Sequence, residues 1–493
     1  MSDPDPQLAA GPDGTHPLGL GRRAFLAGLG GGAGLLLARG LGAGRLPGAS
    51  QGEALAYPEA LRQFAASLTP GQRKLIVLPA DHPSRQITNT IAFLDRPHLG
   101  TLLSPGQRLL AERLYQSMVS TQGLRDFAGT LAVEGRFGGC VLAIYGEPER
   151  GHAQTHLMGG HIHVRGGGIS PEGAAFGGAV AYGHQVGNLR WRVEGNSFAY
   201  HSDAANQLHA LLSADDRERA IVAELPHELM LQPQTADAAF PGVRFGALSE
   251  AGREQAGRLL DTVFSGYPRA QREQALGCIE ANGGTDELHI AYFASRGFYQ
   301  DMTAWSELGP EERVLRGQPY WQVWRIEGPG TVIHFKGYPH VHAYINVVRD
   351  PRRANLGESL GEVDSTVEGD AMRRLLEAAL RRATGTELAW YGPDVPGRFC
   401  PGVVTSGLAY ALDPYGNRVV VATLKGSQMA PVLRERLEAD GTRIAPDKSY
   451  RVASTGYLVR EHGVFGDPER VEKSDLLVRD ALLAHLRAGG LTA

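Results

Sequence analysis

The stretch "YWQVWRIEGPGTVIHFKGYPHVHAYINVV", residues 320–348, contains three runs rich in β-branched and aromatic residues. The runs cover residues 320–326, 331–335 and 341–348, and segments with Gly or Pro separate them. Runs of this composition between turn-forming residues predict three consecutive β-strands. Two earlier segments, "CVLAIYG" (140–146) and "HIHVR" (161–165), predict further strands for the same reason.

A short phrase that is typical of helix starts recurs between the strands. It reads "LTPGQR" (68–73), "LSPGQR" (103–108), "LSADDR" (212–217), "LSEAGR" (248–253) and "LGPEER" (308–313). The hydroxyl group of its Ser or Thr can accept hydrogen bonds from the first-turn amides, and the Pro that often follows needs no N–H there. The N-caps predicted in this way are Thr69, Ser104, Ser213 and Ser249. After Ser104 we expect one helix that continues until Gly123 stops it.

The 493-residue chain is too long for one ordinary core, so we expect more than one domain. Residues 57–356 mix helices and strands and predict an α+β main domain. The polar stretch 352–370 predicts a segment that connects this domain to the rest of the chain. A helix near 370–383, followed by strands at 418–424 and 449–455, predicts a smaller C-terminal α/β domain over residues 370–493.

The first 50 residues have the pattern of an export signal. Arg22 and Arg23 precede an apolar, glycine-rich run, which resembles a twin-arginine signal and implies the twin-arginine translocase as a partner during export. We therefore expect a periplasmic or extracellular protein whose mature form has no stable membrane span. Cleavage after Ala43 or near Ala56 fits the sequence equally well.

Composition narrows the class of protein. Apolar residues make up 42% of the chain, charged residues 21%, and the formal net charge is -4, so no broad basic surface for nucleic acid is expected. A small-molecule substrate remains possible. Cys140, Cys278 and Cys400 lie far apart in the sequence, without the spacing of a metal or redox motif, and we expect small buried residues.

Two histidine clusters fall on or beside predicted strands. Alternate side chains of a strand share a face, so His161 and His163 point the same way, as do His340 and His342. Each pair follows an earlier histidine, and the six predicted ligands are His156, His161, His163, His334, His340 and His342. If the two strands are neighbours, four to six imidazoles converge on a transition metal ion such as Zn, Cu or Fe. His152 and His156 are expected in a loop at the mouth of this site.

Two carboxylates lie near these segments. Glu147 follows the strand at 140–146, and Asp350 follows the strand at 341–348. Either could act as a metal ligand, as a catalytic general base or as a group that orients an imidazole. For Asp350, a salt bridge or turn capping explains its position as well.

The segments "AIYGEP…GGHIHVRG" and "YWQVWRIEGPGTVIHF…HVHAYINVVRDP", with the repeated helix starts, resemble the bacterial family catalogued as domain of unknown function 3500. The resemblance covers about residues 57–356 and implies one fold unit in which these histidines matter. The family pattern has adjacent histidines where this chain has His161-Ile162-His163. The family suggests no particular reaction.

The tail resembles a second family over about residues 385–475. "GLAYALDPYGNRVVVATLKGSQMAPVLRERLE" and "PDKSYRVASTGYL" are similar to the C-terminal substrate-binding domain of secreted 5'-nucleotidases. The resemblance implies that Tyr415 and Asn417 contact a base and that Arg398 contacts a phosphate. The Asp-x-His and Gly-Asn-His-Glu segments of the nucleotidase catalytic domain do not occur in the sequence.

These features lead to three hypotheses about function. The first is an exported, histidine-ligated metalloenzyme of unknown substrate that performs hydrolysis or oxidation. The second is a non-catalytic periplasmic metal-binding protein. The third is a nucleotide- or phosphoester-related hydrolase that uses the tail to bind its substrate.

Overall fold

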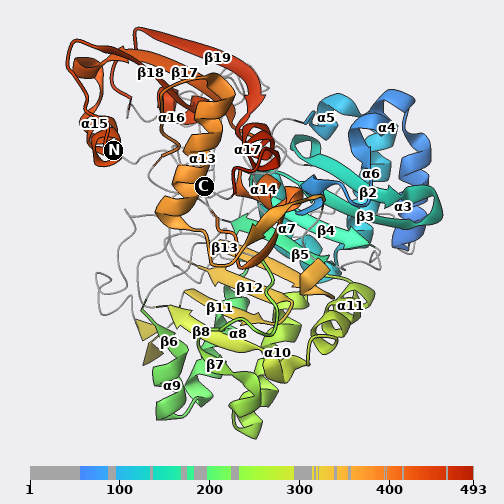
Figure 1. Cartoon of the computed structure of the whole chain (residues 1–493). Coiled ribbons are helices and arrows are strands. Elements are labelled where there is room, and N and C mark those ends of the chain that lie inside the picture. The colour runs from blue at the N-terminus through green and yellow to red at the C-terminus, as the bar shows by residue number, and fades with distance from the viewer. Residues whose placement is uncertain are drawn as a thin grey trace, which may run out of the picture. The chain divides into compact units, whose positions relative to one another are not determined.

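The protein has an α+β fold, as the sequence predicts (Figure 1). The computed structural model describes residues 56–86, 96–133, 137–167, 175–182, 197–223, 232–293, 314–315, 318–319, 321, 323–337, 341–353, 357–392, 395, 397–413, 416–461 and 465–491. The export signal predicted in the first 50 residues lies outside this part of the chain. Within it, no helix has the length and apolar character needed to cross a membrane.

The chain forms two compact units. The described part of unit 1 lies between residues 56 and 353, without residues 81–86. Unit 2 contains residues 81–86 together with the described residues from 357 to 491. Each unit has its own apolar core.

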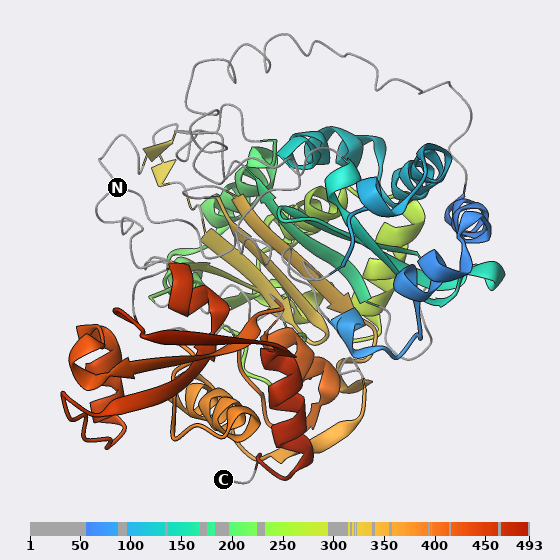
Figure 2. The same cartoon turned by 90° about the horizontal axis from the view of Figure 1, so that it is seen from above.

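The described residues of unit 1 build an 11-stranded sheet in the order β1-β2-β3-β4-β5-β13-β12-β11-β8-β6, with β7 paired to β8. Figure 2 shows its central strands side by side. The strands are β1 (Val77–Leu78), β2 (Val141–Glu147), β3 (His152–Met158), β4 (Ile162–Gly167), β5 (Ala175–Tyr182), β6 (Ile221–Val222), β7 (Val243–Arg244), β8 (His289–Phe293), β11 (Val323–Gly328), β12 (Thr331–Lys336) and β13 (Val341–Val348). The two-residue strands β9 (Val314–Leu315) and β10 (Gln318–Pro319) pair with each other. The segments of this unit that the sequence predicts as strands therefore all contribute to one sheet.

The register of the sheet separates apolar from polar side chains. One row across the strands is apolar and buried: Leu142, Leu157, Val164, Ile345, Ile333, Ile326 and Ile290. The adjacent row points to the opposite face, because side chains alternate along a strand. It combines the apolar residues Val141, Met158 and Ala291 with His163, Tyr344, His334 and Arg325. The sheet therefore has one apolar and one polar face.

Helices cover the apolar face. A Cβ atom added to Gly166 in β4 would lie 2.4 Å from Cγ of Met118, and the hydroxyl group of Tyr292 in β8 donates to the Ala205 carbonyl at 2.7 Å. Both contacts place helices of unit 1 against this side of the sheet. The described helices of unit 1 are α3 (Tyr57–Ser67), α4 (Pro70–Ile76), α5 (Leu99–Leu102), α6 (Pro105–Met118), α7 (Thr121–Val133), α8 (Ala199–Leu211), α9 (Ala214–Ala220), α10 (Glu250–Phe264) and α11 (Arg269–Glu280).

The four predicted N-caps are confirmed. Thr69 and Ser104 form capping boxes with Gln72 and Gln107, and Ser213 and Ser249 accept from backbone amides of the first turn. The fifth predicted start, 308–313, lies outside the described residues.

The prediction that one helix runs from Ser104 to Gly123 is wrong. Helix α6 ends at Met118, and Gly123 lies inside α7. Gly123 is needed there for a close approach, because a Cβ atom at this position would lie 2.1 Å from the Gly266 carbonyl oxygen.

Unit 2 contains a mixed four-stranded sheet in the order β15-β18-β17-β19 and a pair of strands, β14 and β16. Its strands are β14 (Ser359–Val363), β15 (Leu388–Ala389), β16 (Gly402–Thr405), β17 (Arg418–Lys425), β18 (Ser449–Thr455) and β19 (Arg470–Leu477). Its helices are α13 (Gly369–Thr384), α14 (Ser406–Leu412), α15 (Pro431–Ala439), α16 (Gly456–Glu461) and α17 (Val478–Arg487). The short 3-10 helix η1 (Pro83–Gln86) packs against α14, although the two are far apart in sequence.

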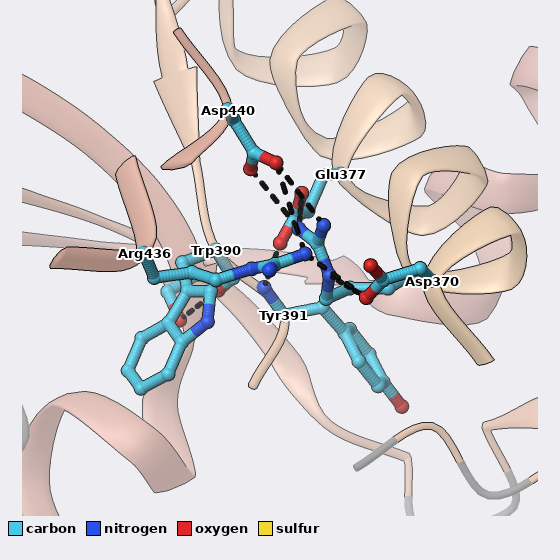
Figure 3. A network of polar contacts seen from close by, with 8 residues as sticks. Asp370, Glu377, Trp390, Tyr391, Arg436 and Asp440 are labelled. Carbon is cyan, nitrogen blue, oxygen red and sulfur yellow. Dashed lines mark hydrogen bonds and ion pairs between the residues drawn. The ribbon is translucent and has the colours of Figure 1, made fainter. Parts of the chain in front are cut away.

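A buried ion-pair network stabilises unit 2 (Figure 3). Nη1 of Arg373 in α13 lies 2.6 Å from Oε2 of Glu377, and both side chains are 2% exposed. The two terminal nitrogens of Arg373 also lie 3.2 and 3.3 Å from the carboxylate oxygens of Asp440 after α15. The other oxygen of Glu377 accepts the backbone N–H of Tyr391 at 3.2 Å. This network joins α13 to the segment after α15 and to the chain just after β15.

None of the three cysteines forms a disulfide. Cys140 and Cys278 are buried, as predicted, and Cys400 is half-buried. Burial raises the pKa of the Cys278 thiol to about 11, so this group stays protonated at neutral pH.

Candidate functional site

A group of buried histidines, cations and amides of unit 1 lies on the polar face of the sheet. We define the polar face by Gln154 and His156 (β3), His163 and Arg165 (β4), Arg325 and Glu327 (β11), His334 and Lys336 (β12), and His342, Tyr344 and Asn346 (β13). His161 immediately precedes β4. All of these residues are buried, with at most 8% of their surface exposed. Buried polar groups of this kind need hydrogen-bond partners, which other protein groups, water or a ligand can supply.

Two imidazoles form the best-defined contact of the polar face. Nε2 of His163 lies 3.2 Å from Nδ1 of His156, and Nε2 of His156 lies 2.9 Å from Oε1 of Gln154. The amide oxygen of Gln154 only accepts, so the His156 Nε2 carries the proton. Nδ1 of His156 then accepts the hydrogen bond from Nε2 of His163, and a metal ion bound by both nitrogens would replace this proton. Gln154 therefore fixes the tautomer of His156.

A third histidine is oriented by a cation. Nε of Arg325 donates to Nδ1 of His334 at 3.3 Å, and Nη1 of Arg325 lies 3.4 Å from the Glu327 carboxylate. A guanidinium group donates but never accepts, so Nδ1 of His334 is unprotonated and its Nε2 carries the proton. Nε2 of His334 is thus a hydrogen-bond donor in this arrangement, and its role as a metal ligand stays a prediction.

Arg165 is held from a strand that is not its neighbour in the sheet. Its Nη2 donates to Oδ1 of Asn346 at 2.9 Å and approaches the Ile345 carbonyl at 3.4 Å. Asn346 belongs to β13, and β5 lies between β4 and β13. The Arg165 guanidinium is therefore fixed on the polar face, beside its Cα partner His156.

The strands that carry the two predicted histidine pairs are not neighbours. The interposed β5 keeps β4 and β13 about 9–10 Å apart, twice the usual strand spacing. His161, His163, His334 and His342 are all buried in this region, and His340 lies outside the described residues. Among the residues that the structure describes, no group of three or more His, Cys, Asp or Glu side chains is arranged to hold a metal ion.

His156 lies in a strand and not in the predicted loop. Strand β3 begins at His152, which is exposed, and His156 points to the polar face in the same row as Arg165. Its ring also packs edge-on against Tyr145, with 4.8 Å between centroids. His156 is therefore central to the site, whereas the sequence predicts a place at its mouth.

The two predicted carboxylates lie at strand ends. Glu147 is exposed at the end of β2 and pairs with Arg150 at 2.9 Å. Oδ1 of Asp350 accepts the backbone N–H of Arg352 at 3.0 Å, which is a turn-capping bond. Their catalytic roles stay predictions.

Of the three predicted substrate-binding residues of the tail, the structure describes Arg398 and Asn417. Arg398 is half-buried and lies 3.8 Å from Glu368, and Tyr415 lies outside the described residues. The side-chain amide of Asn417 donates to Oδ1 of Asp413 at 2.9 Å. Burial raises the pKa of the Asp413 carboxyl to about 6, although the bond from Asn417 and the charge of Arg479 lower it in part. Their contact with a nucleotide stays a prediction.

Three cations and an amide of the polar face were not among the predicted site residues: Gln154, Arg165, Arg325 and Lys336. The sequence contains a pattern that could have identified them. Each of the four lies two positions along a strand from a histidine or a carboxylate, so the two side chains share a face. His163-Val-Arg165 and His334-Phe-Lys336 follow the same alternation as His161-Ile-His163.

No curated protein is significantly similar to this chain in sequence. Solved structures that resemble it include a 5'-nucleotidase precursor from Thermus thermophilus, with 13% identity and a TM-score of 0.25, over 36% of this chain and 50% of that one. They also include the NAD nucleotidase of Haemophilus influenzae, with 12% identity and a TM-score of 0.24, over 36% of this chain and 54% of the other. The chain thus spans about half the length of these proteins.

A family model matches residues 51–303, just over half of the 493 residues. The match includes α3 to α11 and the strands from β1 to β8, with His156, His161 and His163 of the site. The chain therefore belongs to the family described as Protein of unknown function (DUF3500).

Proposed function

We propose that the protein is an exported enzyme whose reaction takes place on the polar face of the unit 1 sheet, with a transition metal ion held by His156 and His163. The observation that carries this proposal is the imidazole pair itself, with 3.2 Å between Nδ1 of His156 and Nε2 of His163. Two Zn–N bonds of about 2.0–2.1 Å separate their nitrogens by about 2.9 Å at a right angle and about 3.4 Å at the tetrahedral angle. The observed separation falls inside this range.

The surroundings of His156 fit a metal ligand. A ligating imidazole usually donates its other N–H to an oxygen that fixes its orientation. Oε1 of Gln154 is such an acceptor, at 2.9 Å from Nε2 of His156. Both imidazoles are completely buried, which excludes the bulk water that would compete for a metal ion.

The chemistry that a metal ion would supply depends on its open positions. Two protein ligands would leave coordination positions for water and substrate, whereas a closed structural site has four protein ligands and a catalytic zinc site usually has three. When bound by His156 and His163, such an ion would supply activation of water for hydrolysis or, if it were Fe or Cu, oxidation chemistry. We rank a catalytic role above metal storage for this reason.

Metal analysis of the purified mature protein tests the proposal. We expect about one equivalent of a transition metal in the wild-type protein and a loss of most of it in a His156→Ala/His163→Ala double variant. The matched control is His152→Ala, because His152 is exposed on the same strand and contacts neither imidazole. Equal metal content in all three proteins would refute the site.

A cobalt-loaded sample separates catalysis from storage. An ion with open positions should show a visible spectrum that changes when azide is added, whereas an ion closed by four protein ligands should not respond. An unchanged spectrum would favour the non-catalytic metal-binding protein.

A further inference from the structure

The first turn of α3 starts from the backbone of Ala56. The carbonyl oxygen of Ala56 accepts the backbone N–H groups of Glu59 and Ala60, at 3.0 and 3.1 Å. Ala56 is the N-cap of this helix, and the carbonyl group of an N-cap accepts the first hydrogen bonds of the helix. The Ala56 side chain is exposed and adds no capping bond. The backbone of Ala56, and not its side chain, is therefore what α3 needs at its start.

Tyr57, the first residue of α3, is anchored on the sheet of unit 1. Its hydroxyl group donates to the carbonyl oxygen of Ala153 at 2.9 Å and lies 2.8 Å from Oγ1 of Thr155. Its ring covers Gly167 so closely that a Cβ atom at that position would overlap with the ring. Ala153 and Thr155 belong to β3 and Gly167 belongs to β4, so two strands hold the residue that follows the Ala56–Tyr57 bond.

Helix α3 continues from this anchor into the apolar core of unit 1. Leu61 and Phe64 are completely buried in that core, and Ala60 is 2% exposed. The helix also packs against α6. Helix α3 is therefore part of the folded protein from its first residue onward.

The sequence fits cleavage of the export signal after Ala43 as well as near Ala56. Signal peptidases read small residues before the cut, and Ala54-Leu55-Ala56 has this pattern. The susceptibility of a bond to a protease depends on the burial and the hydrogen bonding of its backbone. The twin-arginine route carries proteins that are already folded, so the protease would meet the Ala56–Tyr57 bond in its folded form. In that form the bond lies between a hydrogen-bonded carbonyl group and an anchored tyrosine.

The product of a cut after Ala56 would also be unfavourable. This cut removes the acceptor of the Glu59 and Ala60 amides and leaves a positively charged α-amino group on Tyr57. Positive charge at the N-terminus of a helix opposes the helix dipole. A cut further upstream keeps the acceptor and places the new charge away from α3.

We propose that the export signal is removed by hydrolysis of the Ala43–Gly44 bond and that residues 44–56 stay on the mature protein, where Ala56 starts α3. Water adds across this peptide bond, which leaves a carboxylate on Ala43 and an ammonium group on Gly44. Ala43 lies outside the described residues, so the choice rests on the contacts that protect the Ala56–Tyr57 bond. The inference rests on the proposed function, because only an exported protein meets a signal peptidase.

Intact mass and N-terminal sequencing of the exported protein test the proposal, after expression of the full chain in a bacterium with a twin-arginine translocase. We expect a mature chain that begins at Gly44. Two matched variants place leucine just before each cut, because signal peptidases need a small residue there. Ala43→Leu should accumulate the precursor or shift the cut, whereas Ala56→Leu should be processed like the wild type. The exposed Ala56 side chain makes no capping bond, so Ala56→Leu leaves the fold unchanged.

The outcomes separate this inference from the proposed function. A mature chain that begins at Tyr57, or a precursor that accumulates only in Ala56→Leu, would overturn the inference and leave export and the metal site standing. A chain that stays at full length inside the cell would refute export and the inference together. Metal analysis of the His156→Ala/His163→Ala variant does not depend on where the chain is cut, so the metal site is tested separately.

Discussion

We predict that His201 makes the protein sensitive to acid. The His201 ring lies in α8 among aromatic rings, at centroid distances of 4.5 Å from Tyr200 and 5.8 Å from both Phe198 and Phe335. Its Nε2 is buried without a hydrogen-bond partner among the described residues. Burial lowers the pKa of His201 from 6.5 to about 3. The folded protein therefore holds this ring neutral in a range where the unfolded chain protonates it.

The sign and size of the effect follow from linkage. Because the unfolded state binds more protons below pH 6.5, the free energy of unfolding falls as the pH drops from about 6.5 toward 3. With these two pKa values, His201 alone removes about 2 kcal/mol between pH 7.5 and pH 5. His209 on the same helix acts in the same direction, since burial lowers its pKa to about 4.

Urea unfolding at pH 7.5 and pH 5, followed by tryptophan fluorescence, measures this loss. A His201→Phe variant keeps a ring in the aromatic surroundings and removes the titrating group, so its loss should be smaller than the wild-type loss by about 2 kcal/mol. His152→Ala, an exposed histidine of β3, should lose as much as the wild type. If His201→Phe and the wild type lose the same free energy, the burial of His201 is not the cause of the acid sensitivity.

Three other predictions concern the buried ion pair of unit 2 and two glycines of unit 1. Arg373→Leu should lower the free energy of unfolding of unit 2 by about 3–5 kcal/mol, because Glu377 stays buried without its closest cation, and Arg373→Leu/Glu377→Leu should recover most of this loss in urea titrations. Gly123→Ala should cost about 1–3 kcal/mol, since its Cβ atom would meet the Gly266 carbonyl oxygen. Gly257→Ala, in the open middle of α10, should instead raise the melting temperature, with a gain of about 0.5–1 kcal/mol.

The strands were predictable because their signal is local. Runs of β-branched and aromatic residues mark β11, β12 and β13, and Ser and Thr caps mark the helix starts. Strand β3 was missed because "HAQTHLM" has polar residues at every second position, a composition that also fits a loop. In a sheet with one polar and one apolar face, this alternation of polar and apolar residues is typical of a strand.

The order of the strands could not be read from the sequence. Strand β5 lies between β4 and β13, and its pairing with β13 joins residues more than 150 positions apart. Its segment "AFGGAVAY" is rich in Gly and Ala and carries no strong strand signal. The sequence alone therefore does not reveal the strand that separates the two histidine pairs.

Burying polar side chains on one face of the sheet lowers the stability of the fold relative to apolar side chains. This loss of stability is an argument that the polar face has a function. Apolar side chains on both faces of the sheet would gain free energy from burial, as the row from Leu142 to Ile290 does on the helix-covered face. The chain instead buries imidazoles, two guanidinium groups and an ammonium group on the other face. Buried charged groups, even when they form ion pairs, often contribute less to stability than apolar residues of the same size. Residues that lower stability relative to apolar alternatives are concentrated at functional sites. The buried residues of the polar face are therefore the first place to look for a bound ligand and for catalysis.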